Sequence, residues 1–268
     1  MTPWKTALSH SDEKQIWIRG QEIAALMTNA SFTDVLFLLH CGRFPSDDER
    51  RLLDAVLIAV ADHGPGSPSA AASRLVASGN RLSPEAAVAA GVLAIGDAHA
   101  GAGMACMQMI EAGLELALRE GISIEKAATR TVDEAIQEKK RLPGLGHRVH
   151  STDPRTSVLF TLAGERKLAG QGIAFLTAVQ IIASAKIKPL PINVDGALAA
   201  VLHDLGFTAL FGKLVFIVGR VAGLSAQVME EYTRERPMRI RIPVTYDGIL
   251  PQADHGANGS NGHNGSRG

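Results

Sequence analysis

Helix-start patterns followed by apolar residues at helical spacing recur along this chain of 268 residues, and they constrain its fold more than any other feature. In Ser46-Asp-Asp-Glu49 the two end residues can each cap the other's backbone N–H, an arrangement called a capping box. The apolar residues that follow share one helix face: Leu52, Leu53, Val56, Leu57 and Val60. Ser31 with Asp34, and Thr131-Val-Asp-Glu134, have the same pattern. These patterns predict a chain built mainly of helices.

Evidence for strands is thin by comparison. Aromatic residues make up only 4% of the chain, and abundant Ala and Leu favour packed helices over sheet. Gln15-Ile-Trp-Ile-Arg19 alternates and predicts one arm of a short hairpin, whereas Pro243 after the alternating Arg239-Ile-Arg-Ile242 predicts an extended edge. Neither strand–helix alternation nor a glycine-rich nucleotide loop occurs. We therefore predict an all-α fold.

Charge and composition exclude several function classes. Lys plus Arg equals Asp plus Glu, so the net charge is zero, which argues against a general nucleic-acid binder. Cys41 and Cys106 are too few for a disulfide framework. The N-terminus shows no apolar signal core, and we expect no stretch as long as a membrane span, so a cytoplasmic location without membrane contact is predicted. Residues 255–268 are rich in Gly and Asn and predict a disordered tail.

Four short segments combine His or Asp with glycine in apolar surroundings. They contain His63, His99, His147 and Asp195. Any one of them could simply be a helix end, where histidine suits the dipole and glycine takes the left-handed conformation. Together, three histidines and a carboxylate form an acid–base set. Zinc is the competing interpretation, but none of the histidines has paired ligand spacing, so we expect no metal.

The motifs around these residues resemble the citrate synthase superfamily. Gly144-Leu-Gly-His147-Arg-Val, followed by Asp153-Pro154-Arg155, is similar to the superfamily signature, and Asn193-Val-Asp195 is similar to its catalytic-aspartate segment. Other matching segments keep the superfamily's order and spacing: Asp62-His63-Gly64, Ser78-Gly79, Gly96 to Ala102, Gly219 to Gln227, Arg236-Pro237 and Tyr246-Asp-Gly248. The resemblance extends from about Ser9 to Gly248.

Two details point to different branches of that superfamily. The chain is shorter than a typical citrate synthase, and its Asn-Val-Asp195-Gly196 segment resembles the citryl-CoA lyase module of ATP-citrate lyase and stand-alone citryl-CoA lyases. His99 instead matches the citrate synthase histidine. The glycine after Asp195 therefore favours cleavage, while His99 keeps condensation open.

The resemblance implies a role for each acid–base residue. Asp195 would move the proton of the acetyl methyl group, and His99 would donate to the thioester oxygen as the enolate forms. His147 would protonate the oxo-acid carbonyl in condensation, or deprotonate the tertiary hydroxyl of citryl-CoA in cleavage. Imidazole suits both directions near neutral pH.

The resemblance also implies which residues bind substrate. His63, Arg155, Arg220 and Arg236 would hold the substrate carboxylates, since the planar guanidinium can meet a carboxylate with two donors. In the superfamily the last of these arginines comes from a partner subunit, which implies a homodimer with shared active sites. The alternative for Arg236 is surface solvation, because it lies in the charged run Arg234-Glu-Arg236. Leu145, Gly146 and Arg148 would lie near coenzyme A, which enters as the acyl-CoA substrate.

The implied architecture has two helical domains around a closing cleft. Residues 1–99 and 207–254 would form the larger domain, and residues 100–206 the smaller inserted one. The first functional hypothesis is a citryl-CoA lyase, which splits citryl-CoA, or a close 3-hydroxy-3-carboxyacyl-CoA, into acetyl-CoA and oxaloacetate. The alternatives are a citrate-synthase-like condensation of acetyl-CoA with oxaloacetate or a related 2-oxo acid, and a non-catalytic subunit that binds CoA or citrate.

Overall fold

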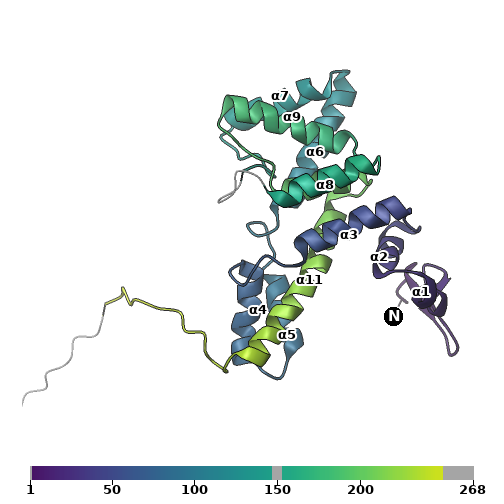
Figure 1. Ribbon diagram of the computed structural model, residues 1–268, viewed down its shortest axis with the longest axis vertical. Helices are drawn as coiled ribbons and strands as arrows, with labels where there is room; N and C mark the ends of the chain where they lie inside the picture. The colour runs from purple at the N-terminus through teal and green to yellow at the C-terminus, as the bar shows by residue number, and fades with distance from the viewer. Residues whose placement is uncertain (1, 147–152, 250–268) are drawn as a thin grey trace, which may run out of the picture.

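The computed structural model describes residues 2–146 and 153–249, and the regular secondary structure of the described part is almost entirely helical. It contains a small three-stranded sheet and eleven helices (Figure 1). The elements in chain order are β1 (Ser9–Ser11), β2 (Ile16–Ile18), β3 (Gln21–Glu22), α1 (Ile23–Asn29), α2 (Phe32–Cys41), α3 (Asp47–Ala61), α4 (Pro68–Gly79), α5 (Pro84–Leu93), α6 (Ala102–Glu120), α7 (Ile124–Gln137), α8 (Pro154–Glu165), α9 (Gln171–Lys186), α10 (Val194–Asp204) and α11 (Ala209–Arg234). The all-α prediction is confirmed.

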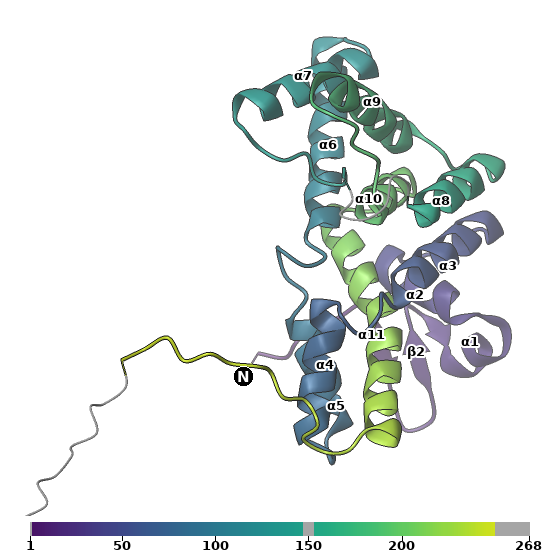
Figure 2. The same cartoon turned by 60° about the vertical axis from the view of Figure 1, so that its left-hand side comes forward.

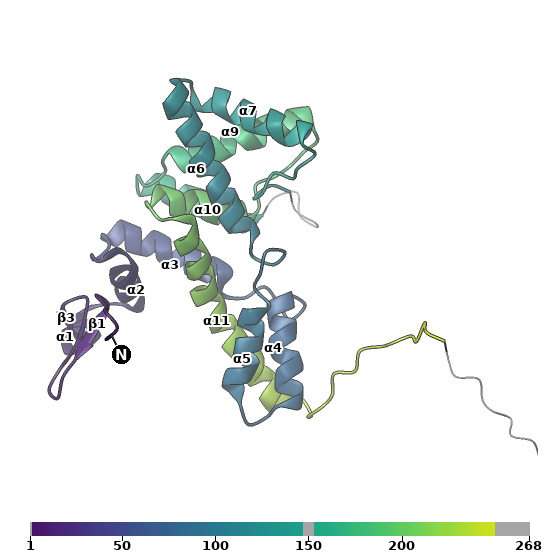
Figure 3. The same cartoon turned by 180° about the vertical axis from the view of Figure 1, so that it is seen from behind.

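The predicted hairpin near the N-terminus is present. β2 pairs antiparallel with β1 and with β3, with Trp17 opposite His10 in the first pairing. The two rings stack with their centroids 5.4 Å apart. The sheet lies beside α1, at one side of the helical body (Figure 3). It is an appendage that plays no part in the main core.

The helix-start patterns succeeded at two of three places. Ser31 and Ser46 each form the full capping box, at the starts of α2 and α3. The pattern at Thr131 does not begin a helix. α7 starts earlier, after Ser123, whose side chain accepts from the N–H of Lys126. Thr131 lies inside α7 and donates to the carbonyl of Ala127 at 3.1 Å, a bond that satisfies the hydroxyl without ending the helix.

α11 links the two ends of the body (Figures 1 and 2). It packs against α3, α4, α5, α6 and α10. One core cluster combines residues of α2, α3 and α6 to α11, and a second, smaller cluster of Ala77, Ala87 and Val228 lies where α4, α5 and the end of α11 meet. The predicted domain boundaries stay a prediction.

The sequence-based expectation that no stretch is as long and apolar as a membrane span is wrong for α11. The helix is 26 residues long, and its best window has a mean hydropathy of 1.6, so by length and composition it could cross a membrane. Its contacts are those of a core helix, however, because Arg220 and Glu231 are buried in it and bond to other elements of the described chain. Beyond α11, residues 239–249 form no strand, as the proline predicted. Arg239 still bonds to Glu231, and the segment then leaves the body (Figure 3).

Candidate active site

Asp195 lies in the first turn of α10, where the helix start is held from both sides. The side chain of Asn193 accepts from the N–H of Gly196 at 3.1 Å and donates to the carbonyl of Gly146 at 2.9 Å. Burial raises the pKa of Asp195 above its usual value. The charges of Arg155, Arg220 and His63 oppose that rise, and the charge of Asp153 adds to it.

The segment that precedes His147 is paired with the segment that precedes Asp195. Leu145 bridges Ile192 in antiparallel fashion. The N–H of Gly146 donates to the carbonyl of Pro191 at 2.7 Å, and the N–H of Asn193 donates to the carbonyl of Gly144 at 3.0 Å. The two motifs that the sequence singled out are therefore neighbours in space, although about fifty residues separate them in the chain.

This pairing needs glycine at positions 144 and 196. A Cβ on Gly196 would lie 2.4 Å from the carbonyl oxygen of Gly144. A Cβ on Gly144 would lie 2.5 Å from the sulfur of Cys106, and the φ of Gly144 is +79°. Gly196 therefore has a packing reason of its own. By itself it does not distinguish a lyase from a synthase, which corrects the weight that the sequence analysis gave it.

His99 lies in the loop before α6, and its ring is fixed by a buried serine. Its Nε2 is 3.0 Å from the hydroxyl of Ser69, which is fully buried in the first turn of α4. Burial lowers the pKa of His99, and the charges of Arg220 and His63 lower it further. The imidazole is therefore biased toward its neutral form.

Arg220 crosses the centre of the site from α11 and is only 3% exposed. Its Nε donates to the carbonyl of Val60 at 2.7 Å, and its Nη1 donates to the hydroxyl of Ser69 at 3.4 Å. The guanidinium lies over the ring of Phe216, 5.0 Å from the centroid. Burial lowers the pKa of Arg220, but the group stays cationic because its usual value is so high. Nη2 donates to no protein atom within the described residues.

Arg155 lies in the first turn of α8 and forms an ion pair with Asp153, the residue that caps the same helix. Nε and Nη2 of Arg155 donate to the two carboxylate oxygens of Asp153 at 3.0 and 2.8 Å. Nη1 donates to the carbonyl of Ala59 at 3.3 Å, which ties α8 to the end of α3. Asp153 is 3% exposed. The bidentate pair holds the guanidinium in a fixed plane beside Asp195.

His63 completes the cluster from the loop between α3 and α4. Its side chain is exposed, and its charge lowers the pKa of both His99 and Asp195. The carboxylate of Asp62 organises that loop by accepting from the N–H of Gly64 at 2.9 Å. Burial tends to raise the pKa of Asp62, but this backbone bond and the amide of Gln227 outweigh it, so the pKa is lowered.

Five of the predicted residues thus come together, whereas Arg236 does not join them within the described chain. The five are His63, His99, Arg155, Asp195 and Arg220. Arg236 is exposed beyond the end of α11, about 20 Å along the helix from Arg220. Its contribution from a partner subunit stays a prediction. So do the roles of Leu145 and Gly146 in binding coenzyme A. His147 and Arg148 lie outside the described residues.

Two residues of the site were not predicted in that role from the sequence: Ser69, and Asp153, which was recognised only as part of a motif. Ser69 carries no signal in its own segment, because its function depends on two residues that are 30 and 151 positions away. The Asp-Pro pair at Asp153 indicates a helix cap. It gives no sign that the carboxylate also binds the guanidinium of Arg155.

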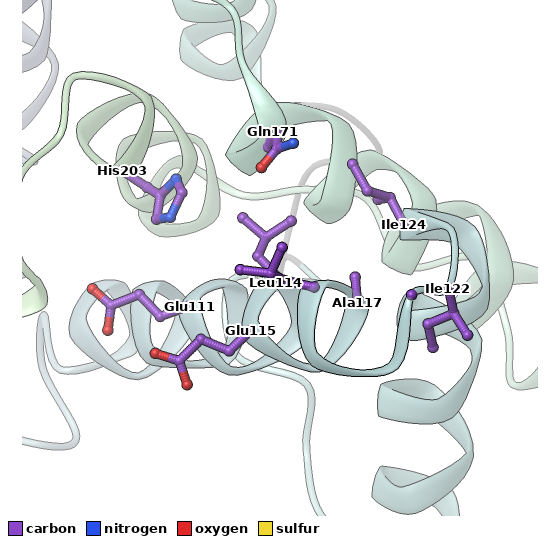
Figure 4. Close-up of a pocket in the computed structure, with 10 residues that line it drawn as sticks. Glu111, Leu114, Glu115, Ala117, Ile122, Ile124, Gln171 and His203 are labelled. Carbon is purple, nitrogen blue, oxygen red and sulfur yellow. The ribbon is translucent and has the colours of Figure 1, made fainter.

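Two cavities differ in their relation to this cluster. A narrow crevice of about 20 Å³ adjoins Asp195 between α3, α6, α10 and α11, and it is lined by apolar side chains such as Met104, Met107 and Phe216. It has room for about one water molecule or methyl group. A larger pocket of about 520 Å³ lies between α6, the start of α9 and the end of α10. Figure 4 shows Glu111 and His203 at that pocket, which contains none of the predicted site residues.

Within residues 2–146 and 153–249, no group of three or more His, Cys, Asp or Glu side chains is arranged to hold a metal ion. The described part of the cluster combines a carboxylate and two imidazoles with two guanidiniums. Such a site can move protons beside a substrate that carries carboxylates.

The helical fold and its cluster of carboxylate, imidazole and guanidinium groups are those of an enzyme that works by acid–base chemistry. The comparisons with known proteins identify its family. The family model for the citrate synthase C-terminal domain matches residues 45–241. The chain belongs to the citrate synthase family. The resemblance predicted from its motifs is therefore confirmed.

Individual relatives differ in how much of their length they share with this chain. The solved structure of citryl-CoA lyase from Hydrogenobacter thermophilus is 39% identical, covers 93% of this chain and 96% of its own, and has a TM-score of 0.85. The citrate synthase of Deinococcus radiodurans is 26% identical over 87% of this chain and 60% of its own length. ATP citrate lyase from Methanosaeta concilii, solved with (3S)-citryl-CoA, has a TM-score of 0.74 at 20% identity over 94% of this chain and 42% of its own, which supports the fold alone. The chain spans about half the length of the curated relatives that it matches.

Proposed function

We propose that this protein is a citryl-CoA lyase, which cleaves citryl-CoA to acetyl-CoA and oxaloacetate. The observation that carries the proposal is the 39% identity to a citryl-CoA lyase over nearly the whole of both chains. The cluster of His99, Asp195 and Arg220 supports it with suitable chemistry. The lyase direction no longer depends on Gly196.

In the proposed cleavage, His147 takes the proton of the tertiary hydroxyl of citryl-CoA. The carbon–carbon bond then breaks, the hydroxyl carbon becomes the carbonyl of oxaloacetate, and the electron pair forms the enolate of acetyl-CoA. Protonated Asp195 gives its proton to the enolate carbon, which yields acetyl-CoA. A raised pKa suits this step, because an ordinary carboxylic acid would hold too few protons near neutral pH.

The bonds of Ser69 suit the tautomer of His99 that carries its proton on Nδ1, and we infer that tautomer for the reaction. Arg220 can only donate, so the hydroxyl oxygen of Ser69 accepts from it. The hydroxyl hydrogen is then free to be donated to Nε2 of His99. This assigns the neutral ring a proton on Nδ1, from which it can donate to the enolate oxygen. The oxygen is stabilised without a full proton transfer.

The cations of the site would bind the carboxylates of the oxaloacetate half. Nη2 of Arg220 has no protein partner in the described chain and is held rigidly by the bonds of Nε and Nη1. His63 lies at the open side of the cluster. Arg155 supplies charge from a fixed position, with most of its donors committed to Asp153 and Ala59.

The proposed assembly is a homodimer in which Arg236 enters the partner's site. α5 is apolar around most of its circumference, and such helices are normally covered. Large apolar side chains are exposed on and near α4, α5 and the end of α11: Leu75, Leu82, Leu93, Met229 and Met238. A second copy would bury this surface. The two free cysteines, Cys41 and Cys106, suit the reducing cytoplasm that we propose as its location.

The direct test is to incubate the purified protein with citryl-CoA and measure both products. We expect rapid release of acetyl-CoA and oxaloacetate. No cleavage, with fast condensation of acetyl-CoA and oxaloacetate, would assign the protein as a synthase. Release of neither product and no condensation would leave a binding subunit.

Shared sites can be tested by mixing two inactive variants. Arg236→Gln and Asp195→Asn subunits, unfolded and refolded together, should regain up to about a quarter of the wild-type activity if each site takes one residue from each chain. No recovery, with mixed dimers shown by mass spectrometry, would mean that each site takes Arg236 and Asp195 from the same chain. Full activity of Arg236→Gln by itself would place Arg236 outside the site.

A further inference from the structure

A buried carboxylate far from the acid–base cluster is the centre of an unusual set of bonds. Glu231 of α11 is 0% exposed. It accepts from Nε of Arg74 at 3.0 Å, and from Nε and Nη2 of Arg239 at 2.8 and 2.6 Å. A buried carboxylate is costly unless it is fully paired. Here both oxygens accept hydrogen bonds. One arginine comes from α4 and the other from the segment that follows α11.

One arm of this set reaches the loop that carries His63. Nη1 of Arg74 donates to Oε1 of Gln227 at 2.7 Å, and Nε2 of Gln227 lies 3.3 Å from both oxygens of Asp62. Because a guanidinium can only donate, Arg74 fixes which end of the amide faces it. The amide N–H₂ must then face Asp62. Asp62 in turn accepts from the N–H of Gly64 and holds the turn in which His63 lies.

The other arm reaches the segment that carries Arg236. Arg239 binds Glu231 and also Glu235, the latter at 3.0 Å. The N–H of Met238 donates to the carbonyl of Ser78 at 2.8 Å, which ties the segment to α4. Met238 has a φ of +56°, so the chain turns sharply there. Arg236 is thus held between the end of α11 and this anchored turn.

We propose that Glu231 is a positioning residue that sets two parts of the substrate-binding machinery together. It places His63 through Arg74, Gln227 and Asp62, and it places Arg236 through Arg239. The inference rests on the proposed function, in which both residues bind carboxylates of the oxaloacetate half. In a dimer, one carboxylate would then order a residue for its own site and a residue for the partner's site.

The arms can be separated by single substitutions. Gln227→Met keeps the length of the side chain but can neither accept from Arg74 nor donate to Asp62, so it cuts the His63 arm. Arg239→Met cuts the Arg236 arm. Glu231→Gln weakens both. Asp204→Asn is the matched control. Asp204, at the end of α10, is also a buried carboxylate, and it accepts three backbone N–H bonds from the start of α9, away from the site.

The measurements are the dissociation constant of oxaloacetate by calorimetry, the kinetics with citryl-CoA, and the Tm of each full-length variant. We expect Gln227→Met and Arg239→Met each to weaken oxaloacetate about tenfold and to raise KM similarly, with kcat changed by less than about twofold, because the lost contacts act equally on bound substrate and transition state. Asp204→Asn should lower Tm and leave both constants unchanged.

If Gln227→Met and Arg239→Met both lower the Tm but bind oxaloacetate as tightly as the wild type, the inference is overturned. The network would then only stabilise the fold. The arms do not depend on Glu231→Gln folding well. If the wild-type protein binds oxaloacetate but does not cleave citryl-CoA, the proposed function fails. The dissociation constants then still decide whether Glu231 positions the site.

Discussion

Asp195 and His99 lie in the same cluster, and the same surroundings shift their pKa values in opposite directions. Burial raises the pKa of Asp195 and lowers that of His99. The charge of Arg220 opposes the first shift and reinforces the second. Burial therefore favours the neutral form of both groups, as an acid in one case and as a hydrogen-bond donor in the other, while the nearby cations add to this effect only at His99.

The two groups differ in what holds them. Asp195 is placed by backbone packing, since Gly144 and Gly196 meet too closely for any side chain. His99 is placed by one side-chain bond, to Ser69, from a loop in which Ala100 has a φ of +66°. Asp195 should therefore be displaced by substitutions that add volume at the two glycines, and His99 by a substitution that removes the hydroxyl of Ser69.

The largest expected effect comes from Asp195→Asn. The amide keeps the shape but cannot give or take the proton, so kcat should fall about 10³-fold. Because the folded-state pKa is raised, stability is lost as pH rises from the ordinary value of 3.8 toward the folded-state pKa, so a cost of ionising Asp195 is present at pH 7. We therefore expect the Tm of this variant at pH 7 to exceed that of the wild type. A lower Tm would show that Asp195 is stabilised by its charge.

Gly196→Ala should give the next largest effect. Its Cβ would lie 2.4 Å from the carbonyl oxygen of Gly144, and backbone on both sides leaves little room to adjust. We expect a loss of about 2 kcal/mol in the free energy of unfolding and a clear fall in kcat as Asp195 shifts. The control is Gly164→Ala in α8, where nothing lies within 4 Å of the added Cβ. Urea unfolding of both variants checks this, and equal stability would refute the close contact.

The features that could be predicted from the sequence are those that depend on local patterns. The helices and the family could be predicted because capping serines, apolar stripes and the segments around Asp195 and His99 are local patterns. The bonds of Ser69 and the buried pairing of Arg74 with Glu231 could not, because each joins residues that no local pattern connects. Thr131 failed for the converse reason: its local pattern was correct, but α7 had already begun at Ile124.

Ser69→Ala should reduce kcat about tenfold, less than either change at the Asp195 side. The variant removes the hydroxyl bonded to Nε2 of His99, which in the inferred tautomer donates to that nitrogen, and it also removes an acceptor of Arg220. Ser73→Ala is the control on the same helix, because the buried hydroxyl of Ser73 has no partner in the described structure. Equal loss of kcat in the two variants would remove Ser69 from the site.

The smallest effect should be seen in the pH dependence of stability. The lowered pKa of His99 means that its neutral form is favoured in the folded state, so the stability it contributes is present above pH 6.5 and is lost as pH falls through the folded-state pKa. His99→Gln does not titrate. The Tm of the wild type minus that of His99→Gln should therefore decrease by about 1–2 °C between pH 7.5 and pH 5. For Asp195→Asn the destabilisation of the wild type should instead shrink as pH falls toward 4. If both differences changed in the same direction, a shared environment could not be the cause of the two shifts.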